Sequence, residues 1–173
     1  MKTYLIPLAL ALATIAPASA TETLNPGNLR FEGTVEGGTC NLIAEDLERA
    51  ISLPPVKIDD FAGVESAGHK PFELSARCDS DITSVTFTFH GTPASSDGAR
   101  FANTGDVSGL ALWLYSQLGG VRQTIRADGN DNTRTLTPSG GQAVLPLGAA
   151  YWKSGVVSEG KLESLATVDV TYN

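Results

Sequence analysis

Residues 29–40 read LRFEGTVEGGTC, an alternating pattern that a glycine interrupts. Apolar and polar side chains alternate in it, as in a β-strand with one buried face. The apolar positions are Leu29, Phe31 and Val35, and Gly33 stands where a fourth apolar side chain belongs. Glycine inside a strand marks either a bulge or a place where another backbone comes close.

The same period of two recurs along most of the chain and predicts an all-β fold. Turn-rich pieces with Gly, Asn and Asp separate the alternating runs, which is typical of a β-sandwich. The one helical candidate is AEDLERAI (44–51). The expected strands are PFELSARC (71–78), SVTFTFH (84–90), GLALWLY (109–115), QAVLPLGAAY (142–151) and SLATVDVTY (164–172).

The first twenty residues, MKTYLIPLALALATIAPASA, have the pattern of a secretory signal peptide. One lysine precedes a short apolar run, and small residues end at Ala20, where cleavage is expected. The alternative, a membrane anchor, is disfavoured because Pro7 and Pro17 interrupt a run that is already short for a bilayer. The mature chain, 21–173, has the length of one domain, and it contains no second apolar run of spanning length.

Charge and cysteine content restrict the partners and the compartment. The formal net charge is −7, from 12 basic and 19 acidic residues, which argues against nucleic acid and anionic membranes as partners. Two cysteines, Cys40 and Cys78, lie in the exported part, and an exported pair predicts a disulfide. Two free thiols, or a zinc site with His69 and His90, are the disfavoured alternatives.

No residue pattern indicates catalysis or a bound cofactor. The sequence has neither a G-x-S-x-G elbow nor a Walker-type glycine loop, and two histidines are too few for a copper–zinc site. The segment DGNDN (128–132) resembles part of a calcium loop but lacks its later glutamate, so a hairpin turn is expected there. A self-contained binding module remains an alternative, with an aromatic platform from Trp113, Tyr115, Tyr151 and Trp152.

The last expected strand stays amphipathic up to its end, which predicts that it is packed. Its apolar face comprises Ala166, Val168, Val170 and Tyr172. Together with the opening stretch, this strand completes a set of motifs in which the chain resembles the pilin subunits of chaperone–usher fimbriae. It is similar to the type 1 fimbrial major subunit. The motifs are Phe31, Gly33, Val35 and Cys40 near the start, FELSARC (72–78), AAY (149–151), Gly160 and Tyr172.

The resemblance implies an immunoglobulin-like sandwich that lacks its final strand. In such pilins a periplasmic chaperone first fills the open groove, and at the outer-membrane usher the N-terminal strand of the next subunit replaces it. The resemblance divides the chain into residues 1–20, a cleaved signal peptide, residues 21–36, a donor strand, and residues 37–173, the pilin domain. The donor strand would pair from Gly27 or Asn28 onward, because Pro26 has no N–H to donate.

The residue roles follow from the same resemblance. Leu29, Phe31 and Val35 would fill pockets of a neighbouring subunit, and Gly33 would lie where the groove is too crowded for a Cβ. The residues expected to face the groove and the chaperone are Gly160, Ala166, Val168, Val170 and Tyr172. The expected function is a non-enzymatic structural subunit of a cell-surface fimbria that supports adhesion, without metal, cofactor or membrane insertion after cleavage. A minor adaptor subunit of the same fibre is the alternative within the family.

Overall fold

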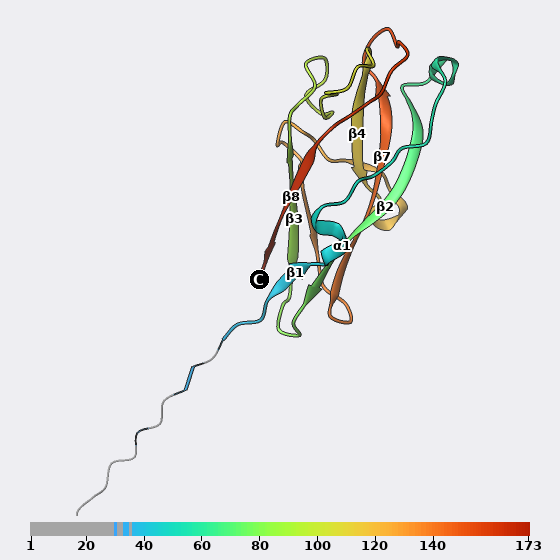
Figure 1. Ribbon diagram of the computed structural model, residues 1–173. Helices are drawn as coiled ribbons and strands as arrows, with labels where there is room; N and C mark the ends of the chain where they lie inside the picture. The colour runs from blue at the N-terminus through green and yellow to red at the C-terminus, as the bar shows by residue number, and fades with distance from the viewer. Residues whose placement is uncertain (1–29, 31–32, 35) are drawn as a thin grey trace, which may run out of the picture. The chain divides into compact units, whose positions relative to one another are not determined.

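Two antiparallel sheets of unequal size form the folded unit, which confirms the expected all-β class. The computed structural model describes residues 30, 33–34 and 36–173. By its internal contacts the chain divides after Val35, and the unit Glu36–Asn173 holds every helix and strand of the described residues. One sheet has the strand order β1-β2-β7-β4-β5, and the other has only β6-β3-β8 (Figure 1).

The strands are β1 (Cys40–Leu42), β2 (Ser66–Cys78), β3 (Val85–Gly91), β4 (Leu110–Ser116), β5 (Gln123–Thr124), β6 (Thr133–Leu136), β7 (Gln142–Lys153) and β8 (Ala166–Tyr172). The helical turns are α1 (Ala44–Leu47) and the 3-10 turns η1 (Ile58–Phe61) and η2 (Leu118–Gly120). All five strands expected between residues 71 and 172 are present. The short strands β5 and β6 carry too few residues for a period to be recognised.

The core lies between the inner faces of the two sheets. Every second residue of β3 points into it, so that Val85, Phe87 and Phe89 are almost completely buried. Leu145 and Leu147 of β7 meet them from the larger sheet. Alternation of apolar and polar residues therefore specifies which face of β3 is buried.

The predicted disulfide is present and joins Cys40 of β1 to Cys78 of β2. The two residues are also register partners in the β1–β2 ladder. Closing a loop across 38 positions stabilises the fold by about 4 kcal/mol in the chain-entropy model. The bond ties the start of the domain to the end of its longest strand.

The predicted helix over 44–51 is wrong beyond Leu47. The carboxylate of Asp46 accepts the backbone N–H of Ser75 in β2 at 2.8 Å, and its second oxygen accepts from Arg49 at 2.9 Å. Arg49 also donates to the carbonyl of Glu73 at 2.8 Å. These contacts attach the segment to β2 and draw the chain away from a helical path, because tertiary partners outweigh a weak helix propensity.

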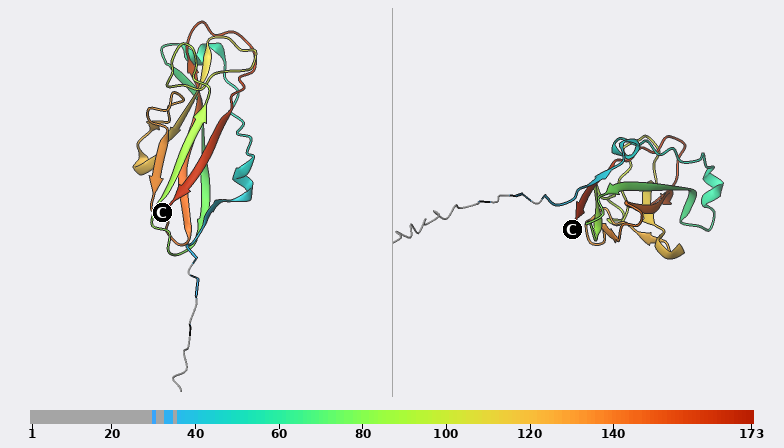
Figure 2. Two further views of the ribbon diagram at one scale, coloured as in Figure 1. Left: turned by 90° about the vertical axis from the view of Figure 1, so that its left-hand side faces the viewer. Right: turned by 90° about the horizontal axis from the view of Figure 1, so that it is seen from below.

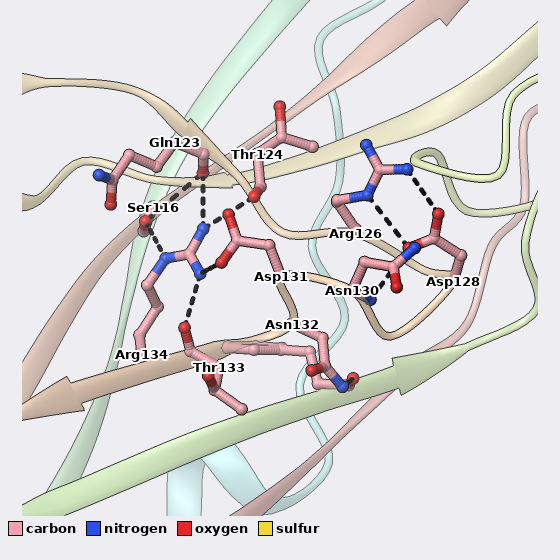
Figure 3. A network of polar contacts seen from close by, with 11 residues as sticks. Ser116, Gln123, Thr124, Arg126, Asp128, Asn130, Asp131, Asn132, Thr133 and Arg134 are labelled. Atoms are coloured by element: carbon pink, nitrogen blue, oxygen red, sulfur yellow. Dashed lines mark hydrogen bonds and ion pairs between the residues drawn. The ribbon is translucent and has the colours of Figure 1, made fainter.

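Arg134 of β6 connects the two sheets on the side of the sandwich shown in Figure 3. Its side chain is only 5% exposed. The guanidinium donates to Ser116 Oγ of β4 at 2.7 Å and to the carbonyl of Thr124 in β5 at 2.8 Å. It also donates to the carbonyl of Gln123 and pairs with Asp131, so a buried cation has its hydrogen bonds satisfied.

Residues 128–132 form a turn, but not the expected hairpin, because β5 and β6 on either side belong to different sheets. The backbone N–H of Arg126 donates to the carbonyl of Asp131 across the turn, and Gly129 adopts a φ of +83°. Hydrogen bonds from the Arg126 side chain and the Asn130 backbone hold the pKa of Asp128 at about 2. The carboxylates of this loop are thus engaged by arginines (Figure 3).

Replacing Arg134 with alanine is expected to lower the free energy of unfolding by about 3 kcal/mol, because several buried acceptors lose their donor. Denaturant unfolding of the purified chain measures the change. Arg126→Ala removes an arginine of the same turn whose ion pair is exposed, and it should leave the unfolding midpoint near that of the wild type. Equal effects of the two substitutions would contradict a connecting role for Arg134.

Candidate functional site: an apolar groove beside the last strand

A groove of about 1490 Å³ opens between the inner faces of the two sheets. Small-molecule sites are typically about 300–1,000 Å³, so this groove is large enough for a segment of polypeptide. Its floor consists of side chains that belong to the core of the sandwich. They are Phe72, Leu74, Phe89, Leu112, Leu114, Ala149 and Tyr151.

Two stretches of backbone border the groove, and neither has a strand partner on the groove side. Strand β8 pairs only with β3 and is the outermost strand of its sheet (Figure 2). On the opposite side, the segment after α1 runs without regular structure to η1, and residues 49–56 make no backbone–backbone hydrogen bond with any described residue. Pro54 and Pro55 lie within it and have no N–H.

Large apolar side chains at the border of the groove face water. Leu47 is 65% exposed, Ile58 48% and Leu165 76%, and all three line the groove. Apolar surface gathered in this way marks an interaction site in a soluble domain. None of these three residues was among the groove residues predicted from the sequence. The alternating pattern indicated the neighbouring strands, but no pattern indicated the irregular course of residues 48–57.

The C-terminal residues singled out from the sequence divide into two groups. Gly160, Ala166 and Val168 line the groove. Val170 is half-buried and packs against the core, whereas Tyr172 at the end of β8 is 44% exposed, and neither lines the groove. The backbone of Asn173 then bonds to Thr83 and Ser84, which holds the end of β8 in place.

Gly160 has a structural reason of its own. Its φ is +145°, a conformation that residues with a side chain rarely adopt. An added Cβ would also lie 2.7 Å from the backbone nitrogen of Val107. Gly160 thus lets the segment before β8 pass close to the loop before β4, next to the groove.

Of the four expected donor-strand residues, Leu29, Phe31 and Val35 lie outside the described residues. Gly33 is described, belongs to no strand, and does not have a positive φ. Its conformation in this chain therefore does not require glycine. The donor-strand roles of these four residues stay predictions.

The aromatic residues considered for a binding platform do not form one surface. Tyr151 packs with Phe61 in a small second core that also lines the groove. Trp113, Tyr115 and Trp152 gather in a separate cluster, in which the ring of Trp113 contacts the rings of the other two. The Arg100 guanidinium lies 3.7 Å from the ring centroid of Trp152 and covers one face of it.

His69 completes this aromatic cluster. Its Nδ1 lies 3.2 Å from the hydroxyl of Tyr115 and its Nε2 lies 3.3 Å from the hydroxyl of Ser66. Burial, and to a lesser degree the Arg122 charge, lowers the pKa of His69 below its ordinary value of 6.5. Tyr115 is 1% exposed, and burial raises the pKa of its hydroxyl. The cluster thus favours a neutral histidine.

The described part of the chain contains neither a cluster of metal-ligating side chains nor a helix suited to span a membrane. No group of three or more His, Cys, Asp or Glu side chains lies close enough together there to hold a metal ion. None of the helices in the same residues combines the length and apolar composition needed to span a bilayer.

The lowered pKa of His69 predicts a pH dependence of stability. As the pH falls below 6.5 the unfolded chain takes up a proton that the folded chain does not, so the free energy of unfolding decreases until the folded pKa is reached. His69→Gln keeps polar contacts without titrating and should flatten this part of the profile. Urea unfolding between pH 7.5 and 5 provides the measurement. A profile unchanged by His69→Gln would contradict the assignment.

Comparison with known proteins places this geometry in a family. The family model for "Fimbrial protein" matches residues 29–173. The type-1 fimbrial protein A chain of Escherichia coli (strain K12) is 23% identical over 95% of this chain and 93% of its own length. The minor fimbrial subunit HifD of Haemophilus influenzae is 27% identical over 95% of this chain and 80% of its own length.

Similarity of fold leads to the same group of proteins. A subunit in a solved chaperone–usher pilus superposes with a TM-score of 0.65 at 18% identity, covering 91% of this chain and all of the other. The fold similarity and the family match over residues 29–173 agree with each other. The chain therefore belongs to the fimbrial protein family, the structural subunits of chaperone–usher pili.

Proposed function

We propose that this fimbrial subunit polymerises by donor-strand exchange, with the groove beside β8 as the acceptor and residues 29–35 of another subunit as the donor. The observation that supports this most directly is the combination of an apolar groove with the unpaired edge of β8. An inserted strand would extend the sheet β6-β3-β8 by backbone hydrogen bonds and cover the floor of the groove. Strand addition to a free edge is a general mode of recognition, and chaperone–pilin complexes are a named example of it.

The energetics suit a stable fibre without an external energy source. Burial of Leu29, Phe31 and Val35 would contribute roughly 1.5–3 kcal/mol each. Exposed groove residues such as Leu165 would be covered at the same time. Because the strand completes the sandwich, dissociation becomes linked to unfolding of the receiving subunit. Slow dissociation would then make the joint long-lived.

Gly33 fits the donor role better than a bulge in its own domain. Its backbone in this chain has no positive φ that would demand glycine. A close approach to the floor of a neighbour's groove gives an independent reason for the missing Cβ. On this interpretation Gly33 is required by the receiving subunit.

Export of the chain requires two partners before it reaches the fibre. We assign the groove to a periplasmic chaperone first and to a sibling subunit at the outer-membrane usher afterwards. Ala166 and Val168, which line the groove, and Val170 and Tyr172, which follow them on β8, would contact the chaperone strand. The fimbrial family places the chain at the cell surface, where it supports adhesion, and residues 1–20 would be its cleaved export signal.

Two questions within the family depend on experiment. The relatives include both a type-1 fimbrial chain and a minor fimbrial subunit, so the proposal of a repeating shaft subunit has a minor adaptor as its alternative. The family consists of structural subunits, which supports a role without catalysis or cofactor. A shaft subunit must bind copies of itself, so its groove must accept its own donor strand. This property distinguishes a shaft subunit from a minor adaptor.

A peptide of residues 25–37, added to a protein of residues 36–173, is expected to raise the melting temperature by about 5–10 °C at a concentration of a hundred times Kd. The same peptide with Gly33→Asp should have no effect, because its side chain would clash with the groove floor. A Thr34→Asp peptide carries the same charge on the opposite face and serves as the control. Thermal unfolding followed by circular dichroism measures the shift.

A Gly33→Asp peptide that stabilises as well as the wild type would end the close-approach explanation. A protein indifferent to its own peptide but stabilised by another subunit's strand would favour the adaptor. A protein that is stable alone and indifferent to every strand would instead indicate a complete, self-contained module.

The receiving side can be tested by Leu165→Asp, which adds a charge at the border of the groove. Because Leu165 is 76% exposed, the substitution should leave the fold intact and reduce uptake of the peptide by at least about tenfold. Val156→Asp is the matched control: Val156 is 90% exposed and does not line the groove. Fluorescence anisotropy of a labelled 25–37 peptide measures uptake. Equal losses in the two variants would argue against insertion at this groove.

A further inference from the structure

Like β8, strand β2 has a free edge beside the groove. It pairs with β7 along Ser66–Arg77, but β1 covers its other edge only from Ala76 to Cys78. The inward-facing residues Phe72 and Leu74 of the same stretch line the groove into which a strand would insert. An unpaired edge of this kind is an open template for any extended segment.

Residues 43–49, which belong to no strand, occupy several polar groups of the β2 edge. The backbone N–H of Ser75 donates to the carboxylate of Asp46 at 2.8 Å. The backbone carbonyl of Ser75 accepts from the backbone N–H of Ile43 at 3.0 Å. The carbonyl of Glu73 accepts from Arg49 at 2.8 Å. Alternate residues of a strand point their backbone groups to the same side, so residue 71 is the next on this edge.

That next position is Pro71, which has no N–H. An incoming strand thus finds no N–H at residue 71. The carbonyl of Glu73 and both backbone groups of Ser75 already have hydrogen-bond partners. Asp46 is held firmly for this purpose: its side chain is 2% exposed and pairs with Arg49 at 2.9 Å. A carboxylate buried to this degree requires such partners.

The edge of β8 differs in every one of these respects. Its groove-facing side makes no backbone or side-chain hydrogen bond with any described residue between Ala166 and Tyr172. The strand contains no proline. Between Pro71 and Ser75 the edge of β2 keeps only the Glu73 N–H and the Pro71 carbonyl without a hydrogen bond to any described residue, whereas β8 presents all the backbone groups of its free edge.

We propose that Asp46 and Arg49, together with Pro71, block strand addition to β2 and so restrict the subunit to one acceptor edge, β8. This inference rests on the proposed donor-strand function and adds a specificity device to it. The excluded partner is an extended apolar segment, the N-terminal strand of another subunit. A subunit with two open edges would accept two strands and would branch or associate out of order.

The test uses the full chain and the 25–37 peptide, with native mass spectrometry for stoichiometry and hydrogen exchange for the site. The wild type should bind one peptide and gain protection at 166–172 alone. In the double variant Asp46→Ala/Arg49→Ala, the Ser75 amide hydrogen should exchange about tenfold faster than in the wild type. That variant should also bind a second peptide or self-associate, with new protection at 70–76. A folded variant with a fast Ser75 amide, one bound peptide and no association would overturn the proposal.

Pro71→Val provides a second route if the double variant fails to fold. It restores an N–H to the edge at an exposed position and leaves Asp46 and Arg49 in place. It should increase protection of 70–76 on peptide addition, and unchanged protection would count against the block. Glu73→Gln changes the side chain of an edge residue without altering its backbone and is the control. If the wild type takes up no peptide, donor-strand exchange fails, while self-association of the variants still tests the β2 edge.

Discussion

A sandwich needs two sheets of similar width to cover one core, and here a five-strand sheet faces one of three strands. The shortfall lies beside β8, where the core side chains Phe72, Leu74 and Leu112 line an open groove instead of a closed interior. Exposure of these apolar side chains to water is unfavourable, so binding of one more apolar strand to the groove is favourable. Assembly of the fibre follows from an unfinished hydrophobic core.

The remainder of the domain is reinforced against the instability that an open core brings. A disulfide ties β1 to β2, and the buried guanidinium of Arg134 links the short sheet to β4 and β5. Asn173 ties the end of β8 to the turn before β3. The Arg134 bonds cross from one sheet to the other, whereas the disulfide and the Asn173 bonds tie elements within a single sheet.

Polar side chains near the groove decide where that strand pairs. Asp46 and Arg49 occupy backbone groups of β2, while β8 stays open. Their role was hidden in the sequence, because AEDLERAI has the composition of a helix and the two residues look like an ordinary surface ion pair three positions apart. Only contact with β2, almost thirty residues further along the chain, gives them their function.

Local period and composition determined much of this protein by themselves. Alternation specified the strands β2, β3 and β8, apolar composition specified β4 and β7, and the exported cysteine pair specified the disulfide, because these signals depend on neighbours along the chain. Motif order identified the pilin family. The tertiary structure alone decided that α1 stops at Leu47, that Arg134 spans the sheets, that Tyr172 lies beyond the groove, and which edge stays free. Those features depend on which strands meet in space, and hydrogen bonds between distant segments leave no period in the sequence.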